Sequence, residues 1–195
     1  MADAMRPFLS DYYGNPSSGH WAGVPAKEAY ENARTQVAKL LDCKPSEIVF
    51  TSGGSEANNY AIKGVYYALR GKGNHIITTQ IEHPAVSKPC DFLRKQGAVI
   101  SYVGVDSDGQ VSPEEIEQLI TDSTILISVM HANNETGVIQ PIKEISRIAK
   151  KHNIAYSGAK RPPVPEETDH RFRRKSTSHS GLKRPLIPEK TDHFW

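Results

Sequence analysis

Phe50-Thr51-Ser52-Gly53-Gly54-Ser55-Glu56-Ala57-Asn58-Asn59 is the stretch that decides how this chain folds. It joins an apolar run, Glu47 to Thr51, which we expect to be a short buried strand, to a run with helical spacing of apolar residues. Adjacent glycines let backbone N–H groups turn toward a ligand, and a helix N-terminus adds unpaired donors. The stretch therefore predicts a phosphate-binding turn at Gly54 and Ser55. The alternative is a glycine turn with Ser55 as an ordinary N-cap.

Two further polar loops follow apolar runs. Gln80-Ile81-Glu82-His83-Pro84-Ala85-Val86 comes after the run from His75 to Thr79. His131-Ala132-Asn133-Asn134-Glu135-Thr136-Gly137 comes after the run from Thr124 to Met130. Ligands of open α/β sheets bind outside the carboxyl ends of the strands, so the three polar segments are expected to converge on one crevice.

The order of elements is typical of an α/β protein with a largely parallel sheet and helices on both faces. Helices are predicted over residues 24–41, from 55, over 84–96, over 112–120 with Ser112 as N-cap, and from Pro141. Besides 47–51, strands are predicted over residues 74–79, 98–103, 124–130 and 153–156. About 156 residues are enough to form a sizeable core.

These segments together resemble a known family. With Gly14-Asn15-Pro16-Ser17-Ser18, followed by His20 and Gly23, they make four motifs in the order of the class V aminotransferases, which depend on pyridoxal phosphate. The cysteine desulfurases and selenocysteine lyases are the most similar members. The resemblance runs from about Met5 to Tyr156, and implies that residues 1–156 are part of the large cofactor-binding domain of a fold-type I enzyme. On this expectation the family's opening strand motif, its later strands and its small domain are missing.

The resemblance implies roles for four residues. Gly54 and Ser55 would hold the phosphate of pyridoxal 5′-phosphate, His83 would stack on its ring and could assist proton transfer, and Asn134 would approach the ring hydroxyl. Each residue also has a purely structural interpretation. A histidine before proline is common in surface turns, and the paired residues Asn133 and Asn134 are typical Asx-turn formers.

The remaining machinery of the family is not identifiable in the sequence. A desulfurase needs a lysine that holds the cofactor as a Schiff base, an acid on the pyridine nitrogen, and a thiol that accepts sulfur. Ala159 stands where the family has its aspartate, and neither Lys183 nor Lys160 lies in the family's lysine motif. Cys43 and Cys90 lack metal or disulfide spacing and are expected to be structural.

Composition changes where the resemblance stops. Residues 157–195 hold 9 Lys and Arg against 5 Asp and Glu and 5 of the 13 prolines, which leaves 15 basic against 17 acidic residues in 1–156. The tail is too poor in apolar residues to offset the entropy of ordering, so we expect it to be disordered. It contains an imperfect repeat, 161–170 against 184–193, with no function that we can assign.

Two functions from different classes remain open. The chain could be an enzyme that takes sulfur or selenium from cysteine or selenocysteine and leaves alanine, or an inactive truncated product that associates with itself or with a full-length subunit. A net charge of +2 argues against nucleic acid as the main partner. No apolar run is long enough for a membrane span, and residues 1–11 do not read as a targeting leader, so a cytoplasmic location is expected by default. The alternative is that a leader was lost together with the opening strand motif of the family.

Overall fold

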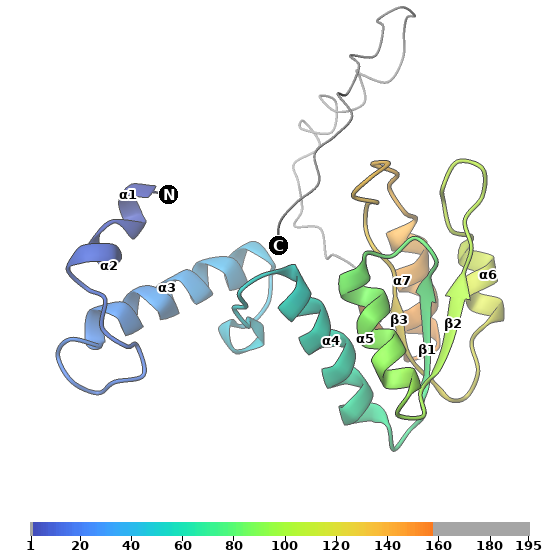
Figure 1. Cartoon of the computed structure of the whole chain (residues 1–195), viewed down its shortest axis with the longest axis horizontal. Coiled ribbons are helices and arrows are strands. Elements are labelled where there is room, and N and C mark those ends of the chain that lie inside the picture. The colour runs from blue at the N-terminus through green and yellow to red at the C-terminus, as the bar shows by residue number, and fades with distance from the viewer. Residues whose placement is uncertain (1, 158–195) are drawn as a thin grey trace, which may run out of the picture. The chain divides into compact units, whose positions relative to one another are not determined.

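The computed structural model describes residues 2–157, which form a parallel sheet covered by helices (Figure 1). The strands run in the order β2-β1-β3-β4, and every neighbouring pair is parallel. Their bounds are β1 His75–Thr79, β2 Val99–Val103, β3 Thr124–Ser128 and β4 Ala155–Ser157. The α/β fold predicted from the sequence is therefore confirmed.

The two central strands are buried because both of their faces are covered by helices. All five residues of β1 and all five of β3 are buried. Successive side chains of a strand point to opposite faces, so Ile76 and Leu126 belong to one core, and Ile77 and Ile127 belong to the other. Two separate cores, one on each face, thus hold the sheet.

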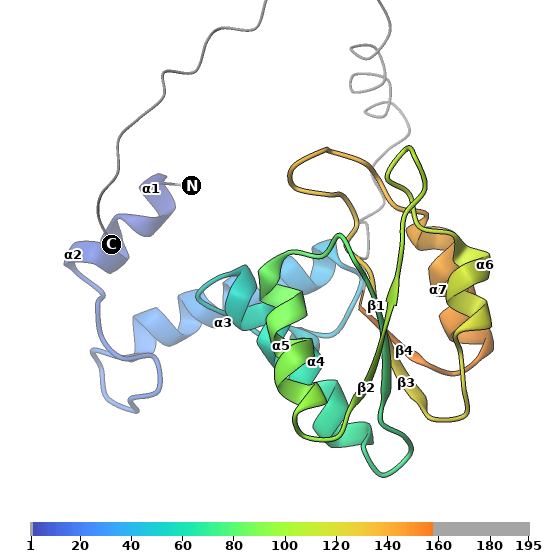
Figure 2. The same ribbon diagram turned by 45° about the vertical axis from the view of Figure 1, so that its right-hand side comes forward.

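Two pairs of helices cover these faces (Figure 2). Helices α4 (Gly54–Leu69) and α5 (Pro84–Arg94) pack together on one face, with Ile62, Tyr66, Val86 and Leu93 in its core. Helices α6 (Pro113–Gln118) and α7 (Ile142–Lys151) cover the other, with Ile116 and Ile145 in its core. Helices on both faces were predicted, although α5 and α6 each end two residues earlier than the sequence indicated.

The N-terminal segment is helical but has little core of its own. It comprises α1 (Ala2–Met5), α2 (Pro7–Ser10), α3 (Val24–Leu40) and the 3₁₀ helix η1 (Pro45–Glu47). Ala38 is the only buried residue of α3, and Leu9 and Trp21 are 77% and 87% exposed. No helix within residues 2–157 combines the length and the apolar character needed to cross a membrane.

The motif at residues 14–23 is a tight loop that requires its glycines. A Cβ atom at Gly14 would overlap the carbonyl group of Ala22, and one at Gly23 would come within 2.5 Å of the carbonyl oxygen of Asn15. The Asn15 side chain also accepts a hydrogen bond from the N–H of Ser17, at 2.9 Å. Glycine is thus needed for close packing at both positions.

The predicted strand over residues 47–51 is wrong. Residues 48–51 form no strand, and Val49 and Phe50 are 53% and 40% exposed. The carbonyl oxygen of Ile48 accepts a hydrogen bond from the Arg34 guanidinium group of α3, and the Phe50 ring packs edge-on against Tyr30 at 5.1 Å. A strand needs a neighbouring strand for its backbone groups, and no strand of the described sheet pairs with this segment.

Candidate functional site

A cavity of about 610 Å³ opens at the carboxyl ends of β1 and β3. Gly54 and Ser55 from the start of α4, His83 from the loop after β1, and Asn134 from the loop after β3 all line it. The sequence thus named four residues that the fold brings to one place. The volume is in the range of small-molecule sites, roughly 300–1,000 Å³. Other lining residues include Asn58, Glu82, Met130, His131 and Ser157.

The start of α4 offers free hydrogen-bond donors to this cavity. The N-cap is Gly53, so the alternative interpretation of Ser55 as N-cap is wrong. Within the described part of the chain, the N–H groups of Gly54 and Ser55 and the Ser55 hydroxyl make no hydrogen bond. A Cβ atom added at Gly54 would meet only open space. Free backbone N–H groups, a hydroxyl group and open space beside Gly54 suit the binding of a phosphate group.

A carboxylate stabilises the turn before this helix. Glu56 accepts hydrogen bonds from the hydroxyl and the N–H of Ser52, at 2.7 and 2.6 Å. The hydrogen bond from the Ser52 hydroxyl lowers the pKa of Glu56 most, and the bond from the Ser52 N–H lowers it further. The carboxylate therefore serves the turn and leaves the donors of Gly54 and Ser55 to the cavity.

His83 is a helix cap that also lines the cavity. It is the N-cap of α5, where its Nδ1 atom accepts a hydrogen bond from the N–H of Ala85 at 3.0 Å. An acceptor at Nδ1 places the proton of the neutral ring on Nε2. The cap also fixes the direction of the ring, which lines the cavity.

The two asparagines divide their roles. Asn133 is the Asx-turn former, since its Oδ1 atom accepts hydrogen bonds from the N–H groups of Glu135 and Thr136, both at 2.9 Å. Asn134 lines the cavity, whereas Asn133 does not. The turn interpretation therefore holds for Asn133, and the ligand role of Asn134 stays a prediction.

Glu82 is a site residue that the sequence analysis did not identify. It lines the cavity, and its Oε1 atom accepts a hydrogen bond from the N–H of Met130 at 2.7 Å. Burial raises the pKa of this carboxyl group to about 7, although the bond from Met130 opposes the shift. The available signal was its position directly after a buried strand, beside His83.

The cavity lacks several groups that covalent chemistry would need. Within residues 2–157, no Lys, Arg or Cys lines it. Lys63 and Lys88 line a neighbouring depression, which shares Ser55 and His83 with the cavity. Cys90 is fully buried in the core under α5, where burial raises the pKa of its thiol to about 11. Ala159, Lys160 and Lys183 lie outside the described residues.

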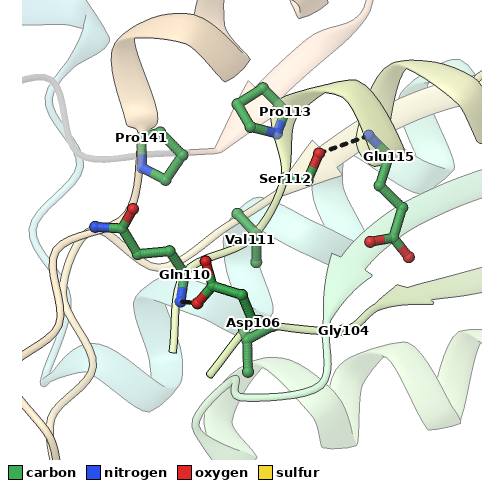
Figure 3. Close-up of a pocket in the computed structure, with 9 residues that line it drawn as sticks. Gly104, Asp106, Gln110, Val111, Ser112, Pro113, Glu115 and Pro141 are labelled. Atoms are coloured by element: carbon green, nitrogen blue, oxygen red, sulfur yellow. Dashed lines mark hydrogen bonds between the residues drawn. The ribbon is translucent and has the colours of Figure 1, made fainter. Parts of the chain in front are cut away.

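A second cavity, of about 480 Å³, lies beyond the end of β2 (Figure 3). Its polar groups are already used by the local backbone. Asp106 Oδ1 accepts a hydrogen bond from the N–H of Gln110 at 2.9 Å, and Ser112 Oγ accepts one from the N–H of Glu115 at 3.1 Å. These bonds form a turn and the N-cap of α6, so Asp106 and Ser112 have structural roles and do not indicate a ligand site.

The family model of the class-V aminotransferases matches residues 1–157. The chain belongs to the aminotransferase class-V family. Among curated members, it is 52% identical over 154 residues to the cysteine desulfurase IscS of Dictyoglomus turgidum. It is 46% identical over 155 residues to the mitochondrial cysteine desulfurase of Arabidopsis thaliana. Each alignment covers 79% of this chain.

Solved structures of this family have the same fold. A NifS-like protein superposes with a TM-score of 0.76 at 42% identity, over 80% of this chain and 43% of that protein. SspA in complex with cysteine gives a TM-score of 0.76 at 39% identity, over 80% of this chain and 45% of SspA. The chain spans 39% of the length of the Dictyoglomus relative and 34% of the Arabidopsis relative. The match to the family ends at residue 157, next to the position where the sequence predicted a break.

Proposed function

We propose that residues 1–157 form part of the pyridoxal 5′-phosphate site of a cysteine desulfurase. The observation that carries the proposal is that Gly54, Ser55, His83 and Asn134 line one cavity at the strand ends. The names of the relatives support cysteine as the substrate class, with selenocysteine as the related alternative. Bound pyridoxal phosphate supplies the electron sink for breaking bonds at the α-carbon of an amino acid.

The residues of this chain would bind and orient the cofactor. Gly54 and Ser55 donate N–H and O–H groups to the phosphate, next to the positive end of the α4 dipole. His83 presents its ring to the cofactor ring, because the hydrogen bond from Ala85 fixes the imidazole. Asn134 supplies a side-chain amide for the ring hydroxyl. The resemblance to the family implies each role, and the position of the four residues in one cavity supports it.

We infer further that this chain alone binds the cofactor weakly and does not turn over its substrate. None of the described residues lining the cavity is a lysine that could hold the cofactor covalently or a thiol that could accept sulfur. The buried Cys90 thiol is not accessible to a substrate. Catalysis would require a lysine and a thiol that the described residues of the cavity do not supply.

Cofactor binding can be tested by titrating the full chain with pyridoxal 5′-phosphate and following the absorbance of the cofactor. Ser55→Ala removes one hydroxyl donor and is expected to weaken binding about fivefold, the effect of roughly 1 kcal/mol. Ser46→Ala, at an exposed serine of η1 outside the cavity, is the matched control. Equal affinities for Ser55→Ala, Asn134→Ala and the unmodified chain would contradict the proposed site.

Turnover is tested separately by measuring alanine release from cysteine in the presence of excess cofactor. We expect no release above the rate of the cofactor alone. A catalytic rate that is abolished by Lys160→Ala or Lys183→Ala would contradict the inactive state of the chain and assign the covalent lysine to the tail.

A further inference from the structure

Glu82 lies where the ends of two neighbouring strands meet. It follows β1 and precedes His83, and its Oε1 atom accepts the N–H of Met130, just beyond the end of β3, at 2.7 Å. The hydroxyl of Thr79, the last residue of β1, donates a longer hydrogen bond to the same oxygen, at 3.5 Å. One carboxyl group therefore links the loop that carries His83 to the loop that carries Asn134.

Within residues 2–157, no cationic side chain lines the cavity beside this carboxyl group. Of the described residues that line the cavity, none is Lys or Arg, and the other titratable ones are His83 and His131. From the elements packed around it, Cys90 of α5 and Tyr156 of β4 are neutral groups whose pKa values are raised by burial first and by the charge of Glu82 second. The Tyr156 hydroxyl is buried without a hydrogen-bond partner among the described residues.

A ligand phosphate would therefore share this cavity with a carboxyl group that no described cation of the lining compensates. Two negative charges in one cavity repel each other, so the phosphate favours the protonated form of the acid. The backbone bond from Met130 persists when the carboxyl group is neutral, because Oε1 remains an acceptor. Protonation thus removes the repulsion without breaking the link between the loops.

We propose that Glu82 is a positioning residue that holds the His83 loop against the end of β3, and that its ionisation weakens the binding of a phosphate ligand in the cavity. The ligand-dependent half of this inference rests on the proposed function. Burial already places the pKa of Glu82 at about 7 in the free chain, so the effect falls near neutral pH. Thermodynamic reciprocity requires that a bound phosphate raise this pKa further.

The ligand-dependent half is tested by titrating the full chain with pyridoxal 5′-phosphate at about pH 6 and about pH 8.5. Glu82→Gln keeps an oxygen acceptor for Met130 but cannot ionise, and both histidines of the cavity are unchanged. Between the two pH values, the affinity of the unmodified chain is expected to fall about tenfold more than that of Glu82→Gln, which corresponds to one pKa unit of coupling. An equal fall in both proteins would overturn the proton linkage.

The positioning half is tested without ligand, by hydrogen exchange in peptides that contain Met130. Glu82→Ala removes the acceptor and should speed exchange of the Met130 N–H about tenfold at a fixed pH, whereas Glu82→Gln should leave it close to the unmodified rate. Unchanged protection in Glu82→Ala would overturn the positioning role. If no protein binds pyridoxal phosphate, the proposed function and the proton linkage both fail, and the exchange experiment still decides the role of Glu82 in the loops.

Discussion

Asn133 donates a hydrogen bond from its side-chain Nδ2 atom to the carbonyl oxygen of Ile81, at 3.2 Å. This bond links the loop after β3 to the loop after β1, as the bond between Glu82 and Met130 does. The same asparagine closes its own turn through two bonds to Oδ1. Three hydrogen bonds of one side chain thus support the wall of the cavity that Asn134 lines.

The neighbouring asparagines are expected to respond differently to substitution. Asn133→Ala should lower the free energy of unfolding by about 1 kcal/mol, because it removes the hydrogen bonds of a partly exposed side chain. Asn134→Ala should change stability little and should weaken binding of pyridoxal phosphate. Urea unfolding followed by circular dichroism, together with cofactor titration, measures both effects. The reverse assignment of effects would contradict the division of roles.

His83 can be separated into its cap and its ring. Asn is a good N-cap residue, so His83→Asn should keep the start of α5 and lose only the imidazole. His83→Ala should lose both, at a cost of about 1 kcal/mol in unfolding free energy. Cofactor affinity should fall in both variants, whereas stability should fall only in His83→Ala. A full cofactor affinity in His83→Asn would exclude the proposed contact between the rings.

His75 is expected to make the fold sensitive to acid. Its ring nitrogens lie 2.8 Å from Thr124 Oγ1 and from Ser101 Oγ, at the opposite end of β1 from the cavity. Burial lowers the pKa of His75 below its ordinary value of 6.5. The folded state therefore favours the neutral ring, and its contribution to stability is lost as pH falls below that value.

Glu82 gives the opposite dependence, because its raised pKa removes stability as pH rises from 4.5 toward about 7. The acid effect of His75 is therefore best measured in the Glu82→Gln background. There, urea unfolding should show lower stability at about pH 5 than at about pH 7, and adding His75→Gln should flatten this difference. An unfolding free energy that rises toward acid pH in the Glu82→Gln protein would contradict the role of His75.

The exposed apolar residues of the N-terminal segment should cause association. Leu9, Trp21 and Leu40 are 77%, 87% and 62% exposed, and exposed apolar surface promotes contact between molecules. Size-exclusion chromatography with light scattering should show a mass that increases with concentration. Replacing all three residues by Ser should reduce it, whereas Tyr60→Ser, at a 64% exposed position of α4, serves as the control. A monomer of constant mass would contradict this expectation.

The sequence predicted most of the sheet because the signals of β1 and β3 are local. Both are isoleucine-containing runs followed by polar loops, and Pro84 and Pro141 mark the starts of the helices that come next. The run at 47–51 carries the same local signal but forms no strand, because pairing depends on a neighbour that lies elsewhere in the chain. Strand propensity alone could not distinguish these cases.

The sequence predicted several residues that line the cavity, but it did not predict all of their hydrogen bonds and pKa values. The loop motifs identified His83 and Asn134, because loops at strand ends line the same crevice. Which of the two asparagines closes the turn depends on backbone geometry, and the raised pKa of Glu82 depends on burial by other elements. The short sequence around these residues determines neither the turn-forming role of Asn133 nor the raised pKa of Glu82.

The strand order has a consequence for the growing polypeptide on the ribosome. β1 lies between β2 and β3, and both neighbours are translated after it, since β1 ends at Thr79, β2 at Val103 and β3 at Ser128. A strand that becomes wholly buried thus waits about 50 residues for its second neighbour. At bacterial to eukaryotic elongation rates of about 5–20 residues per second, this delay lasts about 2–10 s. For that interval the nascent chain presents the unpaired backbone edge of β1 to chaperones and to other nascent chains.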